Sequence, residues 1–475
     1  MTWAGVSPAI GEIFLAFAVC LVLMVDVFAG AAARRVTPTL TLLTLVVCAG
    51  LLVGVGQVGV RTELFDGLYV ADPVSWVLKL AALLFVAVSL VYSRGYMDLR
   101  GTSRGEYYVL ALTALLGIFV LTSANSLLTV YIGVELLALS VYAMVAFDRD
   151  NGIAAEAAMK YFVLGAIASG VLLYGMSIIY GITGTLALDQ LAGKLSNPGP
   201  GVVLGLAFIV VAVAFKLGAV PFHMWLPDVY EGAPTNVTLF IATAPKVAYF
   251  SLALRLLAHG LSGVSAQWTS MLAPLAVLTL ILGNVVAIAQ TSLKRMLAYS
   301  AIANVGFIVL GFVTGTPAGY GASLYYTLVY VLATLGTFGV MLLLTAQGYE
   351  ADKLDDYKGL YSRDPLLALV MMALMFSTAG VPPFVGFWAK LAILQQLWAT
   401  GHMGLVIIGA LTSVVGAFYY LRVVKLMYFD QPAAGKPLPE RQPAVRIAVC
   451  LNGIAALGLG VLPGPLLSLC SQLLH

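Results

Sequence analysis

Residues 215–228 read FKLGAVPFHMWLPD and directly follow the apolar run GVVLGLAFIVVAVA at 201–214. A lysine therefore lies inside a segment of membrane-spanning length, with a glycine two residues and a proline five residues after it. Proline frees a backbone carbonyl about one turn earlier, and glycine permits a distorted backbone. Non-helical backbone at membrane depth is tolerated only where protein buries it or where it lines a hydrated cavity. The stretch predicts an interrupted membrane helix around a sheltered charge.

The composition is that of an integral membrane protein. The chain has 475 residues, of which 61% are hydrophobic and only 9% are charged, whereas soluble domains contain about 25% charged residues. The apolar runs are long and unbroken, which is typical of spanning helices and not of the short alternating strands of an outer-membrane barrel. We therefore predict an all-α membrane protein without a soluble domain.

Apolar runs of span length predict about fourteen transmembrane helices. Their expected limits are 8–28, 38–58, 71–92, 107–122, 125–146, 155–181, 201–226, 236–258, 267–289, 295–314, 319–347, 365–399, 403–429 and 443–470. The twelfth is too long for one simple crossing and contains Pro382-Pro383, so we expect it to be broken, like the seventh. The N-terminus lacks a basic region and a cleavage site, so we interpret it as the first span.

The distribution of lysine and arginine orients the spans. Odd-numbered connections contain 16 of these residues and even-numbered connections contain 3 (Arg61, Lys194 and Arg255). The 16 are Arg34, Arg35, Arg94, Arg100, Arg104, Arg149, Lys294, Arg295, Lys353, Lys358, Arg363, Arg422, Lys425, Lys436, Arg441 and Arg446. Because cytoplasmic loops are enriched in positive charge, we expect the odd-numbered connections to face the cytoplasm and both termini to lie on the other side of the membrane.

Four charges are expected inside spans: Glu135, Lys216 and Lys246 near the middle of theirs, and Lys390 past the break in the twelfth. Each costs roughly 2.5 to 3.5 kcal/mol at a helix centre, so charges at this depth usually mark functional sites. The plainer interpretation of Glu135 and Lys216 is a structural ion pair, although apolar replacement of such pairs is often neutral.

Two further lysines lie nearer the ends of their spans. Lys79 and Lys160 could extend their amines to the membrane interface, and we rank Lys160 above Lys79 as a functional candidate.

Helix-breaking residues accompany three of the four buried charges. Gly218 and Pro221 follow Lys216, Pro245 precedes Lys246, and Pro382 and Pro383 precede Lys390. Burial and a nearby carboxylate act in opposite directions on the proton affinity of an amine. A lysine whose partner approaches or withdraws can therefore take up and release a proton.

A short internal similarity supports this hypothesis. GAVPFHMW at 218–225 resembles AGVPPFVGFW at 379–388. Two interrupted helices in corresponding positions are typical of transporters built from inverted repeats with a site at the membrane midplane.

The motifs resemble a known family. They are FKLGAVPFHMWLPDVYEGAPTNVT at 215–238, TAPKVAYF at 243–250, SLKRMLAYSAIANVGF at 292–307, KLDDYKGL at 353–360 and AGVPPFVGFWAK at 379–390. In this order they resemble the antiporter-like membrane subunits of bacterial proton-translocating NADH:quinone oxidoreductase (respiratory complex I). VYEGAPT with TAPKV, lysine at position 390, and an end soon after the last span favour the N-subunit family over the M and L subunits.

The resemblance implies a set of roles. Glu135 and Lys216 would form the carboxylate–lysine pair, Lys246 the central relay, Lys390 the terminal relay, and Lys160 an additional lysine of the proton path. It also implies an N-terminal three-helix region at 1–106, antiporter-like repeats at 107–258 and 259–430, and a C-terminal loop and helix at 431–475. FMN, iron–sulfur clusters and quinone would belong to partner subunits, with the M, K and J subunits as membrane neighbours. We expect this chain to bind no cofactor or metal and no nucleic acid.

Three other functions were considered. A multisubunit sodium/proton antiporter shares the broken spans, but a sodium site needs oxygen ligands and mid-span carboxylates other than Glu135 are nearly absent. A related membrane-bound hydrogenase or plastoquinone-type complex remains open at this stage. A purely structural anchor leaves the mid-depth lysines without a reason.

Overall fold

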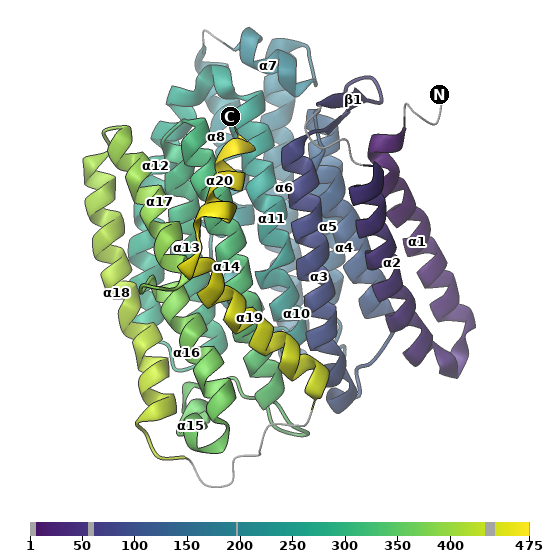
Figure 1. Cartoon of the computed structure of the whole chain (residues 1–475). Coiled ribbons are helices and arrows are strands. Elements are labelled where there is room, and N and C mark those ends of the chain that lie inside the picture. The colour runs from purple at the N-terminus through teal and green to yellow at the C-terminus, as the bar shows by residue number, and fades with distance from the viewer. Residues whose placement is uncertain (1–5, 56–60, 196–197, 433–441, 475) are drawn as a thin grey trace. The chain divides into compact units, whose positions relative to one another are not determined.

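The computed structural model describes residues 6–55, 61–195, 198–432 and 442–474. Within them the chain is almost entirely helical (Figure 1) and forms two compact units. The first comprises Met1–Leu90, Thr102–Val213 and Ala244–Trp268, and the second comprises Val91–Gly101, Ala214–Thr243 and Thr269–His475. These units are defined by packing, so the repeat boundaries expected from the sequence stay a prediction.

The first unit contains the N-terminal helices. Its elements are η2 (Ser7–Ala9), α1 (Ile10–Phe28), η3 (Gly30–Ala32), α2 (Ala33–Val55), the strands β1 (Thr62–Leu64) and β2 (Tyr69–Ala71), most of α3 (Pro73–Arg100), α4 (Glu106–Thr122), α5 (Leu127–Val145), α6 (Gly152–Thr183), α7 (Leu188–Lys194), most of α8 (Pro200–Leu217), α11 (Ala244–Ala253), the π-helix η4 (Leu254–Gly260) and η5 (Ser262–Val264). The strands pair antiparallel, with Glu63 opposite Val70.

The second unit contains most of the remaining helices. They are α9 (Trp225–Gly232), α10 (Thr235–Ala242), most of α12 (Ser265–Ile288), α13 (Leu293–Val313), α14 (Pro317–Leu344), η6 (Leu354–Tyr357), α15 (Leu360–Arg363), α16 (Pro365–Ala379), α17 (Val385–Ala399), α18 (Met403–Tyr428), α19 (Pro443–Val461) and α20 (Gly464–Gln472). The ends of α3 and α8 also belong to it.

The predicted spans are confirmed, with two refinements. In the described part of the chain, 12 helices are long and apolar enough to cross a membrane. The shorter apolar helix α4 and the α16–α17 pair supply the other two of the fourteen. The last expected span, 443–470, is not one helix, because Pro463 separates α19 from α20. The end of the second expected span, and Lys436 and Arg441 from the charge count, lie outside the described residues.

Glycine allows close helix packing in the first unit. A Cβ on Gly117 of α4 would lie 2.5 Å from the backbone nitrogen of Leu137 on α5, and one on Gly133 would lie 2.8 Å from that of Leu121. Small residues let membrane helices approach at backbone distance, where van der Waals contacts are most numerous. The α4–α5 pair therefore depends on the absence of these two side chains.

The core of the second unit is α14. All but a few of its residues are buried, and it packs against α10, α13, α16, α17, α19 and α20. Figure 1 shows the yellow α19 and α20 running obliquely across α14. A helix that is mainly apolar on every face suits the centre of a bundle, and the buried hydroxyls of Ser323, Thr327 and Thr337 bond to backbone carbonyls.

Both predicted helix interruptions are confirmed. α8 ends at Leu217 and α9 starts at Trp225, while α16 ends at Ala379 and α17 starts at Val385. A third interruption lies at Thr243, between α10 and α11. Pro245, which the sequence offered as a helix breaker, is the second residue of α11, just after this third interruption.

Candidate functional site

The two main interruptions share one backbone pattern. Gly218 has a φ of 86°, and its amide donates to the carbonyls of Ala214 and Phe215. Gly380 likewise has a φ of 86°, with its amide donating to the carbonyls of Phe376 and Ser377. This left-handed conformation is accessible to glycine at little cost. In both cases the next residue donates to the same first carbonyl, so each helix ends in the same way.

Lys216 lies in the last turn of α8, immediately before the first interruption. Its side chain is 2% exposed. The indole nitrogen of Trp225 donates to the Phe215 carbonyl at 3.0 Å, and the amide of Val220 donates to the Thr279 hydroxyl at 2.9 Å. The polar backbone groups released by the break are therefore satisfied inside the protein, as membrane depth requires.

Lys390 lies on the first turns of α17, just after the second interruption. Its amine donates to the carbonyl of Ala379, at the end of α16, at 2.8 Å and to the hydroxyl of Ser413 at 3.0 Å. The amine also lies 5.4 Å from the centre of the Phe307 ring. The broken helix thus provides a carbonyl acceptor for a buried cation, which is the arrangement that the sequence motif predicts.

A small cavity adjoins Lys390. Its volume is about 10 Å³, and its walls include Asn304, Tyr326, Ser377, Thr378 and Lys390. A polar cavity of roughly 10 to 15 Å³ holds one water molecule when two or more polar groups can bind it. The lysine has a third N–H donor for such a water molecule.

A chain of hydrogen bonds leads away from this cavity. The Tyr326 hydroxyl donates to Asn304 Oδ1 at 2.7 Å, and Asn304 Nδ2 donates to the Tyr420 hydroxyl at 3.2 Å. Tyr420 and the Ser300 hydroxyl are 2.5 Å apart. Hydroxyl groups both donate and accept, so they can conduct protons as well as stabilise the core. Sequence reasoning missed these residues because tyrosine, serine and asparagine in a span carry no distinctive signal.

Lys246 lies in α11, next to the third interruption. Every residue of this helix is buried, and Lys246 is 3% exposed. It lies within Thr235–Gly260, one of the candidate membrane spans, and its role stays a prediction.

Glu135 and Lys160 differ in their surroundings. One carboxylate oxygen of Glu135, Oε1, is buried without a hydrogen-bond partner among the described residues. The side chain of Lys160 is 46% exposed and pairs with Glu156 at 2.9 Å on the same face of α6. Glu135, Lys160 and Lys246 belong to the first compact unit, and Lys216 and Lys390 belong to the second.

Lys79 does not extend toward a membrane interface, contrary to one expectation from the sequence. It is 2% exposed, and its amine lies 2.5 Å from Glu12 Oε1. Each residue resembles an ordinary span-end charge, so only the packing of α1 against its neighbours reveals the pair.

A polar cluster surrounds Glu350 in the second unit. Tyr96 donates to Glu350 Oε1 at 3.0 Å, and Arg100 and Thr235 also bind this carboxylate. Burial raises the pKa of Glu350, but Lys294 and the hydrogen bonds outweigh burial and lower it overall. Lys294 was expected in an odd-numbered connection between spans. It is 3% exposed and donates to the Ala233 carbonyl at 2.7 Å.

Within the described residues, no group of three or more histidine, cysteine, aspartate or glutamate side chains is placed to hold a metal ion.

Comparison with known proteins gives a consistent result. The family described as NADH:quinone oxidoreductase/Mrp antiporter, TM, matches residues 124–416. The NADH-quinone oxidoreductase subunit N of Herminiimonas arsenicoxydans is 50% identical over 479 residues, covering 98% of this chain and 97% of the relative.

Solved structures have the same fold. A chain of respiratory complex I from Thermus thermophilus with bound Aureothin superimposes with a TM-score of 0.84 at 35% identity, over 97% of this chain and 99% of that chain. A chain of the Mrp complex from Dietzia sp. DQ12-45-1b has a TM-score of 0.88 at 21% identity, over 100% and 97% of the two chains, and this likeness shows the fold alone. The resemblance expected from the motifs is confirmed, and the chain belongs to the subunit N family of NADH-quinone oxidoreductase, the antiporter-like membrane subunits of respiratory complex I.

Proposed function

We propose that this subunit moves protons across the membrane through buried lysines at its interrupted helices. The observation that carries the proposal is the setting of Lys390, whose amine binds the Ala379 carbonyl freed by the α16–α17 break beside a water-sized polar cavity. A buried amine with a water molecule in reach can exchange its proton, whereas a structural ion pair needs a carboxylate instead. Among the described residues no carboxylate pairs with Lys390, which supports the first role.

The proposed relay uses the residues singled out in the sequence. Glu135 and Lys216 form its entry, Lys246 its middle and Lys390 its end, with Lys160 as an additional donor near the cytoplasmic side. Quinone reduction in neighbouring subunits drives it by changing the electrostatic balance at Glu135. Glu135 Oε1 is buried without a hydrogen-bond partner among the described residues, which supports this assignment. Such an atom raises the free energy of the fold unless a partner or a proton binds it.

The test is Lys390→Met, which keeps the bulk of the side chain and removes the proton carrier. We expect NADH-driven acidification of sealed vesicles to be largely lost, while NADH oxidation by an artificial acceptor persists because the redox centres lie elsewhere. Lys425→Met is the matched control, since Lys425 is 66% exposed and pairs with Asp430 at 3.3 Å. Full proton pumping in Lys390→Met, with the complex assembled, would refute the relay.

The surroundings of the subunit are also proposed. Its membrane neighbours are the M, K and J subunits, and FMN, iron–sulfur clusters and quinone are bound by partner subunits. It lies in the bacterial inner membrane with both termini on the periplasmic side. The excess of lysine and arginine in the odd-numbered connections supports this orientation.

A further inference from the structure

The buried pair of Lys79 and Glu12 is part of a three-residue group. The Lys79 amine lies 2.5 Å from Glu12 Oε1 and donates to the Tyr69 hydroxyl at 2.9 Å. The Tyr69 hydroxyl in turn donates to Glu12 Oε1 at 3.1 Å. We call Glu12, Tyr69 and Lys79 the N-terminal triad. Its members come from α1, β2 and α3 and are all buried.

Stability alone does not explain the triad. Replacing a buried ion pair by apolar side chains is often neutral or stabilising, because desolvation offsets the attraction. The second oxygen of the carboxylate, Glu12 Oε2, is buried without a hydrogen-bond partner among the described residues. Cys48 of α2 also titrates nearby, with its thiol 3.8 Å from the Gly11 carbonyl. From α4, the ring of Phe119 lies against the Lys79 amine, whose nitrogen is 5.7 Å from the ring centre. The triad is therefore a net-neutral site with room for one more proton on Glu12.

A cavity leads from the triad toward the end of the first unit where the strands lie. Its volume is about 30 Å³, and its walls include Ser7, Thr62, Asp72, Ser75 and Lys79. This volume is enough for one or two water molecules, since one needs roughly 10 to 15 Å³. Lys79 has three N–H donors, of which two bind Glu12 and Tyr69, so the third is available to the cavity.

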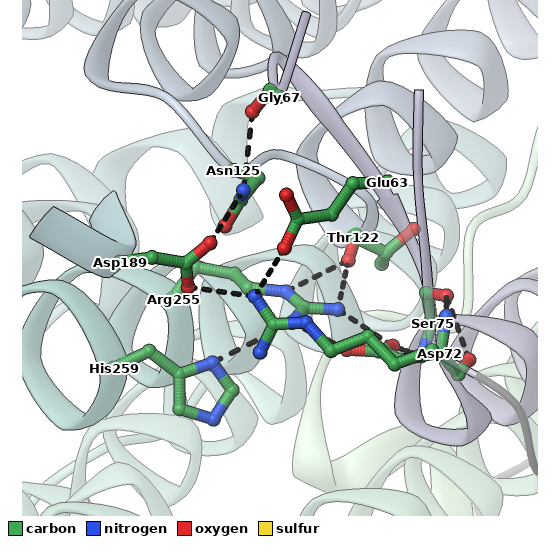
Figure 2. Close-up of polar contacts among 10 residues, drawn as sticks. Glu63, Gly67, Asp72, Ser75, Thr122, Asn125, Asp189, Arg255 and His259 are labelled. Atoms are coloured by element: carbon green, nitrogen blue, oxygen red, sulfur yellow. Dashed lines mark hydrogen bonds and ion pairs between the residues drawn. The ribbon is translucent and has the colours of Figure 1, made fainter. Parts of the chain in front are cut away.

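A polar network continues from the far wall of the cavity. Both carboxylate oxygens of Asp72 accept from Arg255, at 2.7 and 2.8 Å, and Arg255 also donates to the Thr122 carbonyl (Figure 2). Arg255 lies 3.4 Å from Nδ1 of His259, which is exposed.

A second hydrogen-bonded group near His259 includes exposed charges. Asp189 accepts from Asn125 at 2.9 Å and from Arg61 at 2.6 Å, and the Arg61 side chain is 48% exposed. Polar groups thus extend from the buried triad to the protein surface.

We propose that the N-terminal triad is a second proton-binding site of this subunit, which exchanges its proton with the surface through the cavity that Asp72 lines. The inference rests on the proposed function and adds to it an exchange site outside the Lys216–Lys390 path. The network residues come from the second, fourth, sixth and eighth connections and their flanks, which the proposed orientation places on the periplasmic side.

The proposed steps transfer only protons and change no oxidation state. Lys79 passes one ammonium proton to Glu12 Oε1, giving a neutral amine and a carboxylic acid. The amine then takes a proton from hydronium in the cavity, which becomes water. The net change is protonation of Glu12, and release follows the same steps in reverse. Asp72 remains ionised beside Arg255 and orients the cavity water, so it acts as a positioning residue.

The test is infrared difference spectroscopy of the purified complex in lipid nanodiscs, titrated across neutral and acidic pH in H₂O and D₂O. We expect a carboxylic-acid band that shifts in D₂O and is lost in Glu12→Gln. In Lys79→Met the carboxylate has lost the amine that delivers its proton, so the pH response of the band should differ from that of the unmodified complex. Asp355→Asn is the control, because the side chain of Asp355 is 72% exposed.

The outcomes separate this inference from the proposed function. An unchanged band in Glu12→Gln would overturn the second site, whatever Lys390→Met does to proton pumping. Full pumping in Lys390→Met would refute the relay and leave the band of Glu12 intact. Should Lys79→Met fail to assemble, the double variant Glu12→Gln/Lys79→Met removes both charges together. In that variant the band should be absent and proton export per NADH should fall.

Discussion

At the scale of single residues, Gly380 determines where the Lys390 amine can lie. A Cβ at position 380 would lie 2.9 Å from Lys390 Cδ and 3.4 Å from its amine nitrogen. The glycine therefore has two functions, because it adopts the positive φ that ends α16 and leaves space for the lysine.

Gly380→Ala is expected to impair proton pumping beyond its effect on stability. A left-handed alanine costs roughly 1 to 2 kcal/mol, and the new methyl group also displaces Lys390 from the Ala379 carbonyl. Gly401→Ala is the matched control, since Gly401 has a φ of 81° and no heavy atom within 4 Å of an added Cβ. Vesicle acidification and thermal stability should be measured for both variants. Equal pumping in the two would show that Lys390 tolerates displacement.

The sequence predicted which charges lie beside helix breakers. It did not predict which residues from distant parts of the chain contact each other. Lys390 and Gly380 belong to one contiguous motif, so their proximity could be predicted. Glu12 and Lys79 lie 67 positions apart in the chain, and nothing local indicates that they meet. Asn304, Tyr326 and Tyr420 were missed for the same reason.

At the scale of elements, the α4–α5 pair depends on close backbone approach. Gly117→Ala would bring a methyl group within 2.5 Å of the Leu137 backbone nitrogen, which cannot move without shifting a helix. We expect a loss of about 1 to 3 kcal/mol, as for overpacked cores, seen as a lower yield of assembled complex and lower thermal stability. Gly170→Ala on α6 is the control, because an added Cβ there meets nothing within 4 Å. A stable Gly117→Ala protein would argue against backbone contact between α4 and α5.

Most elements could be predicted because apolar length and helix breakers are local signals. The π-helix η4 could not be predicted, because no pattern of residue types distinguishes its wide turn from an α-helix. At its end the Leu261 amide donates to the Leu256 carbonyl at 2.8 Å. The three-residue strands β1 and β2 are too short to show alternation. Pro463 indicates a break between α19 and α20. We nevertheless predicted one span there, because apolar residues continue on both sides of this proline.

At the scale of the whole molecule, each compact unit has a partly buried carboxylate, Asp72 or Glu350, whose pKa neighbouring cations lower. Burial raises the pKa of Asp72, but Arg255 and hydrogen bonds lower it overall to about 2. A carboxyl group with a lowered folded-state pKa contributes stability above its unfolded value of about 4, and this is lost as the pH falls toward 2.

Protonation of Asp72 in acid is therefore expected to lower the free energy of unfolding by about 2 kcal/mol. Hydrogen exchange of residues 254–260 in the purified complex, corrected for the intrinsic rate at each pH, should accelerate below pH about 4. Asp72→Asn should exchange faster at neutral pH and lose this pH dependence, while Asp355→Asn should match the unmodified protein. A wild-type profile unchanged by Asp72→Asn would mean that the ion pair does not hold η4.

The α16–α17 interruption also bears on how the protein is made. Each of these helices has 15 residues, which spans about 22 Å, whereas the hydrocarbon layer is about 30 Å thick. Neither half can bridge the bilayer by itself, and α17 brings an amine with it. The insertion machinery must therefore release both helices into the membrane together. A nascent chain that pauses after α16 has only one of the two helices that this crossing needs.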